Sequence, residues 1–123
     1  MAEKAKYEIY LDEKIQIIRE KIDGPVDEED TKNITAVSKA LVKQLKDPQK
    51  VKLLVSVSNF RSTPSKVRKL FINGLKLNSV YKVAITGPNP YLEALITFFF
   101  IATGINKVKL FNNEREAIQW LNE

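Results

Sequence analysis

Two polar turns hold the side chains best suited to binding a charged ligand. Residues 58–65 read SNFRSTPS and follow an apolar stretch, and residues 86–89 read TGPN. In each turn a polar residue, Thr63 or Asn89, stands directly before a proline, which is typical of a helix start. Free backbone amides at a helix start, with hydroxyl and cationic side chains beside them, bind phosphate or carboxylate. One interpretation is that these polar residues only cap helices; the other is an anion-binding site formed by Ser58, Asn59, Arg61, Ser62, Thr63, Ser65, Lys66, Thr86, Gly87 and Asn89.

The composition excludes several kinds of chemistry. The chain contains no cysteine and no histidine, which excludes disulfides, thiol nucleophiles, imidazole acid–base catalysis and Cys/His metal sites. It also lacks the glycine-rich motifs of nucleotide-binding loops. The acidic cluster at residues 27–30 could hold a metal ion, but a helix start explains it without a cation, because Asp27 is a good N-cap and carboxylates suit the positive end of a helix dipole. We therefore expect no enzyme activity, no cofactor and no metal site.

The net charge of +5 is distributed unevenly along the chain. Residues 48–90 carry eight Lys/Arg residues and no acidic residue, whereas residues 1–47 and 91–123 are acidic on balance. A predicted helix in the basic segment has Lys66, Lys69, Asn73 and Lys76 on its outer face. Such a face suits an acidic protein or anionic lipid headgroups, or is simply solvated. Nucleic acid is disfavoured, because the chain has no RNA-binding signature and its strands lack interleaved exposed aromatic residues.

Hydrophobic periodicity predicts the element order ββαβαβαβα. Alternation indicates a pair of strands at the start, and near-continuous apolar stretches are typical of buried parallel strands further on. The expected strands cover residues 7–11, 15–22, 51–60, 80–87 and 107–111, and the expected helices cover residues 27–45, 62–78, 89–104 and 112–123. No linker or repeat interrupts this pattern. We expect one α/β domain over residues 1–123, with a mixed sheet flanked by helices.

Apolar spacing predicts which side of two helices packs on the sheet. The residues expected to be buried are Ile34, Val37, Leu41 and Leu45 in the first helix and Val67, Leu70, Phe71 and Gly74 in the second.

The predicted helix at residues 89–104 is apolar on almost every side. At 100° per residue, the side expected to cover the sheet carries Ala94, Leu95, Phe98, Phe99 and Ala102, and the opposite side carries Glu93 and Thr97. Apolar residues also face outward beside Thr97, where charges would be expected. Neighbouring segments cover them, or they form a homodimer patch, or they line the mouth of an apolar pocket. The candidates for that pocket or interface are Phe71, Ile72, Leu75, Ile96, Phe100 and Ile101.

The sequence also bears on the cellular location. The first ten residues, MAEKAKYEIY, lack an apolar signal core. The apolar run in helix 89–104 is shorter than the roughly 20 residues that a transmembrane helix needs. We therefore expect a cytoplasmic protein without a transmembrane segment, in which peripheral contact with a membrane remains open.

The C-terminal third resembles a known family. Lys82–Gly87 reads KVAITG, Val108–Phe111 forms a short strand ending in Phe, and EAIQWL follows at residues 116–121. Together with the upstream element order, this pattern is similar to the STAS fold in its SpoIIAA-like branch. The resemblance implies a four- or five-stranded mixed sheet flanked by helices, and a non-catalytic regulatory or ligand-binding role.

The resemblance also has consequences for the first polar turn. In anti-sigma-factor antagonists of this fold, a phosphorylatable serine follows the third strand in an Asp-Ser context. No aspartate stands in the corresponding turn here, although Ser62, Thr63 and Ser65 supply hydroxyls for phosphorylation. Some members of the branch are likened to lipid-carrying CRAL-TRIO domains, which implies an apolar ligand.

These observations lead to three hypotheses for the function. The first is a binding or regulatory module that uses the second and third helices to contact a protein partner or small ligand. The second is a carrier of a small amphiphile, with its tail near Ile72 and Phe100 and its headgroup at Arg61 or Lys66. The third is a structural subunit that associates with itself as a homodimer.

Overall fold

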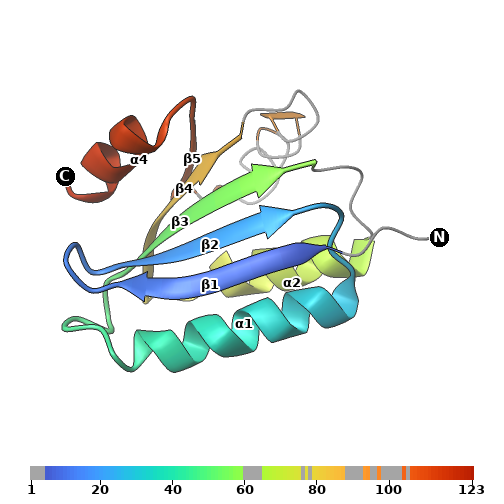
Figure 1. Ribbon diagram of the computed structural model, residues 1–123, viewed down its shortest axis with the longest axis horizontal. Helices are drawn as coiled ribbons and strands as arrows, with labels where there is room; N and C mark the ends of the chain where they lie inside the picture. The colour runs from blue at the N-terminus through green and yellow to red at the C-terminus, as the bar shows by residue number, and fades with distance from the viewer. Residues whose placement is uncertain are drawn as a thin grey trace.

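The computed structural model in Figure 1 shows a β-sheet with helices on both of its faces. It describes residues 5–59, 65–75, 77, 79–87, 93–94, 97, 104 and 106–123. The strands are β1 (Lys6–Asp12), β2 (Ile17–Asp23), β3 (Val51–Ser58), β4 (Val80–Thr86) and β5 (Val108–Phe111). The helices whose bounds the structure gives are α1 (Glu28–Val42), α2 (Ser65–Leu75) and α4 (Glu114–Leu121). These elements follow one another as the sequence predicts.

The strands lie in the sheet in the same order as in the chain, β1-β2-β3-β4-β5. β1 and β2 form an antiparallel hairpin across residues 13–16. β2, β3, β4 and β5 are parallel neighbours. Parallel neighbours need a crossover connection, which α1 provides between β2 and β3 and α2 provides between β3 and β4. The predicted mixed α/β sheet is therefore confirmed.

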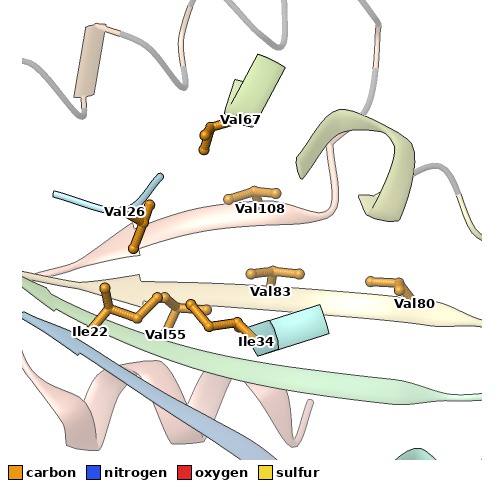
Figure 2. Close-up of a cluster of buried hydrophobic side chains, with 8 residues drawn as sticks. All are labelled: Ile22, Val26, Ile34, Val55, Val67, Val80, Val83 and Val108. Carbon is orange, nitrogen blue, oxygen red and sulfur yellow. The ribbon is translucent and has the colours of Figure 1, made fainter. Parts of the chain in front are cut away.

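Helices α1 and α2 cover one face of the sheet and bury its main hydrophobic core. Figure 2 shows Ile34 of α1 and Val67 of α2 grouped with side chains from the strands; the buried residues of this core are Ile22, Val26, Ile34, Val55, Val67, Val80, Val83 and Val108. Val67 has no exposed surface. Burying one aliphatic side chain of this size contributes about 1.5–3 kcal/mol, so Val67 fixes α2 to the sheet.

Helix α4 packs on the opposite face of the sheet, near one end of the strands (Figure 1). Its residues Ala117 and Leu121 form a buried cluster with Ile17, Leu54 and Ala84. Each of these five side chains is at most 1% exposed. The middle strands are therefore covered on both faces, which explains their near-continuous apolar sequence.

An arginine of β2 also holds α4 in place. The Arg19 guanidinium pairs with Glu114 in the first turn of α4. It pairs as well with Asp12 at the end of β1, where Nη2 and Oδ2 are 3.1 Å apart. These ion pairs join the hairpin, the sheet and the helix.

The predicted buried stripe of the first helix is wrong at Val37, which is 42% exposed. The buried side of α1 continues from Ile34 to Ser38, whose hydroxyl donates to Oε1 of Glu20 at 2.8 Å. Glu20 is only 6% exposed, and this burial raises its carboxyl pKa. A polar residue thus faces the sheet because a buried carboxylate needs a hydrogen-bond donor. The helix ends at Val42, and Leu45 is buried from the turn that follows.

Two helix starts have side-chain caps, and the one at Asp27 was predicted from the sequence. Oδ1 of Asp27 accepts from the amide of Asp30 at 2.7 Å, and Oδ2 of Asp30 accepts from the amide of Asp27 at 3.1 Å. Oδ1 of Asn113 accepts from the amide of Glu116 at 2.9 Å. The acidic cluster at residues 27–30 therefore serves to begin α1.

Most of the predicted helix at residues 89–104 lies outside the described residues. Glu93, Ala94 and Thr97 have helical backbone and exposed side chains. The outward positions of Glu93 and Thr97 agree with the prediction, whereas the inward position of Ala94 is wrong. Ala94 lies only about 60° around a helix from Thr97, so it shares the exposed side. Among the described residues, no helix has the length and apolar character needed to cross a bilayer.

Candidate functional site

The carboxyl ends of three parallel strands meet at one edge of the sheet, where α/β proteins tend to bind ligands. β2 ends at Asp23, β3 at Ser58 and β4 at Thr86. Asp23 is the register partner of Ser58, and Thr86 is the partner of Ser56. The structure therefore brings together the beginnings of the two polar turns that the sequence singled out.

An aspartate occupies this edge beside the first turn. Asn59 has a left-handed backbone with φ of 54°, and its Nδ2 donates to Oδ1 of Asp23 at 2.7 Å. This hydrogen bond, and another from Ser58, lower the pKa of the Asp23 carboxyl. The backbone amide of Gly24 donates to the carbonyl of Ser58 at 2.9 Å. The Asp23 carboxylate thus accepts hydrogen bonds from Ser58 and Asn59, which places a negative charge beside these two residues of the predicted anion site.

The second turn begins with a close approach between β3 and β4. The Thr86 hydroxyl donates to the Ser56 hydroxyl at 3.0 Å, and both side chains are half-buried. Gly87 follows with φ of 96°. A Cβ at this position would lie 2.0 Å from the carbonyl oxygen of Val57. Gly87 is therefore required for the packing of the backbone, whether or not a ligand binds here.

A shallow hollow of about 420 Å³ opens beside these strand ends. Side-chain alternation places Lys21, Asp23 and Ser56 on the same face of the sheet as α4. Lys6 and Glu8 of β1 and Ser58 of β3 also belong to the polar part of the lining. Cations and carboxylates are both present, so this lining is not that of a purely cationic anion site.

Helix α2 presents a basic surface next to the first turn. Lys66, Arg68 and Lys69 are all exposed, as is Asn73. The first turn of α2 contains no acidic residue. Positive side chains at this end of a helix are disfavoured by the helix dipole. The sequence correctly predicted that this side of the helix is basic and exposed, with Val67 on the buried side.

The remaining predicted residues lie beyond what the structure describes. Arg61, Ser62, Thr63 and Asn89 are outside the described residues, as are Ile96, Phe100 and Ile101. Ser65, Phe71, Ile72 and Leu75 belong to α2, but their side chains are not described. The anion-binding, phosphorylation and apolar-contact roles of these residues stay predictions.

Comparisons with known proteins agree with this fold. A family model described as SpoIIAA-like matches residues 17–122. The crystal structure of an uncharacterised protein from Shewanella loihica PV-4 with a SpoIIAA-like fold superposes with a TM-score of 0.71 at 18% identity. The match covers 98% of each chain. No curated protein matches the chain in sequence.

Proposed function

The chain belongs to the SpoIIAA-like family, and from this premise we propose that it is a single-domain, non-catalytic binding or regulatory module that contacts an acidic protein partner through α2. Lys66, Arg68 and Lys69 carry the proposal. All three are exposed in the part of α2 where the helix dipole disfavours cations. A carboxylate of a partner would offset the repulsion between these basic residues and the positive end of the helix dipole. No acidic residue in the first turn of α2 already does so.

The rigidity of α2 supports the proposal. Val67 lies between these basic residues in sequence and is completely buried. Figure 2 shows Val67 of α2 in the buried cluster, so the helix backbone is held on the sheet, whereas the three basic residues are exposed. A surface that is ordered before binding loses less conformational entropy on association than a flexible one.

A matched pair of variants tests the proposal. The first is K66Q/R68Q/K69Q, and the control is K14Q/K39Q/K43Q, which removes the same charge from exposed positions elsewhere. Proteins captured from the source cells are quantified by mass spectrometry, and a candidate is then purified and titrated. We expect a partner that the α2 variant loses and the control retains. Equal loss in both variants would refute a specific contact at α2.

The two other hypotheses give different outcomes in the same preparation. A bound amphiphile would add mass to the intact protein in native mass spectrometry and would favour the carrier. A dimer in analytical ultracentrifugation that a Phe100→Glu variant dissociates would favour the self-associating subunit. Neither outcome is expected if α2 binds a separate acidic protein.

A further inference from the structure

The opposite edge of the sheet carries a second group of functional side chains, which we call the lysine–aromatic surface: Lys50, Tyr81, Lys82, Lys109 and Trp120. The Lys50 ammonium lies 4.4 Å from the centre of the Tyr81 ring. Lys82 lies 5.3 Å from the Tyr81 ring and 4.8 Å from the Trp120 ring. Lys109 lies 6.0 Å from the Trp120 ring. Cations and rings therefore form one continuous surface from the start of β3 to the end of α4.

The backbone fixes the ring of Tyr81 at this edge. Val51 pairs with Val80, but Lys52 pairs with Lys82, so Tyr81 is an extra residue in β4. A β-bulge of this kind redirects a side chain. Tyr81 is 38% exposed as a result, although it belongs to a central strand. Its ring lies on the outside, where Lys50 reaches it.

The end of α4 fixes Lys82. Its ammonium donates to the carbonyl of Trp120 at 2.7 Å, and the backbone oxygen of Glu123 is 3.5 Å away. A cation at the C-terminal end of a helix stabilises its free carbonyls. Lys82, a half-buried residue, thus connects β4 with α4.

The surface has an excess of positive charge. Within the part of the chain that the structure describes, the carboxylate ion pairs involve Arg19 and Lys32 and none of these lysines. An adjoining hollow of about 180 Å³ adds Lys46 and Lys52, with Asp47 as its acidic residue. An acidic ligand would therefore find several cations held in place by contacts with aromatic rings.

We propose that the lysine–aromatic surface binds an acidic segment of a protein, with glutamate or aspartate side chains on Lys50, Lys82 and Lys109 and the aliphatic part of the segment on Tyr81 and Trp120. Single-stranded nucleic acid fits less well, because the ammonium groups already lie over the rings on which bases would stack. This surface begins where β3 and β4 start, whereas α2 begins after β3 ends. The inference is therefore independent of the function proposed for α2.

The test uses the full chain and a labelled peptide of alternating glutamate and serine. Its affinity is measured by fluorescence anisotropy, and emission from Trp120, the single tryptophan, reports contact at the surface. The variant K50Q/K82Q/K109Q should bind the peptide about tenfold more weakly. The loss of three exposed ion pairs, each with a small binding free energy, together gives this change in Kd. K14Q/K39Q/K43Q and K66Q/R68Q/K69Q should each stay within about twofold of the parent.

Because Lys82 also contacts α4, K50Q/K109Q provides a variant that keeps the Lys82 hydrogen bonds, and it should still weaken binding severalfold. Equal binding of a glutamine–serine peptide would overturn the proposal. So would equal weakening by the control lysines, or loss of binding only in the α2 variant. Tighter binding of a single-stranded oligothymidylate of the same length would overturn it in favour of nucleic acid.

Discussion

Replacing Gly87 with alanine tests the closest backbone approach in the candidate site. The added Cβ would lie 2.0 Å from the carbonyl oxygen of Val57 and 3.1 Å from its carbonyl carbon. Real Cβ contacts do not fall below 3.0 Å, so β3 and β4 must separate by at least about 1 Å at this edge. Both atoms that approach Cβ most closely belong to the backbone, and neither can move by a change of rotamer.

The expected cost has two parts. A non-glycine residue in the left-handed region loses about 1–2 kcal/mol, and φ at Gly87 is 96°. Forcing extra volume into a packed site costs about 1–3 kcal/mol. The sum, about 2–5 kcal/mol, is a large share of the 5–15 kcal/mol that stabilises a typical domain.

Urea unfolding followed by Trp120 emission measures this loss as a lower midpoint with an unchanged slope. Gly104→Ala is the matched control, because its φ is 69° and no described atom lies within 4 Å of its Cβ position. It should lose only the backbone part, about 1–2 kcal/mol. Gly74→Ala lies inside α2 with similar space and should gain about 0.5–1 kcal/mol. If Gly87→Ala costs no more than Gly104→Ala, the close approach is refuted.

Three further predictions concern other residues of the fold and the site. Because burial raises the pKa of Glu20, the folded state holds this proton more tightly than the unfolded chain, and stability should fall as pH rises from the ordinary carboxyl range through the raised pKa. In the Glu20→Gln variant, the free energy of unfolding measured with urea should no longer fall across that pH range. If it falls as in the parent, another group causes the decline. Asn59→Gly keeps the left-handed backbone but removes the amide donor, so NMR titration should show the pKa of Asp23 rising toward its usual value, and an unchanged pKa would contradict the hydrogen bond. Ile34→Ala should lose about 2–5 kcal/mol, whereas Val37→Lys should change stability by about 0.5 kcal/mol or less; the reverse order in thermal or urea unfolding would contradict the observed orientation of α1.

Much of the fold follows from local sequence signals. The cap at Asp27 predicted where α1 begins, since a cap depends on residues within one turn. The apolar stretches predicted β3 and β4 because helices cover both faces of the middle strands. The orientation of α1 was less accessible. Ser38 faces the sheet because its hydroxyl donates to Glu20 on β2. Helical periodicity of apolar residues cannot predict that hydrogen bond.

The functional residues were harder to predict where their partners are distant in sequence. Asp23 reaches Asn59 through the parallel register of β2 and β3, which the sequence alone does not specify. The basic side of α2 was predictable because it depends on positions within one helix. The lysine–aromatic surface was not, because Tyr81 faces outward through a bulge and Lys82 meets Trp120 only after α4 has docked.

The place of α4 in the chain sets the order in which the molecule can assemble. Strands that are neighbours in the sheet are consecutive in the chain, so each can join the growing structure as synthesis proceeds. Ile17 and Leu54, however, are covered by Ala117 and Leu121, which are made much later. A nascent chain therefore leaves this apolar patch uncovered until α4 has emerged from the ribosome. During that interval, the patch is where we expect a chaperone to bind.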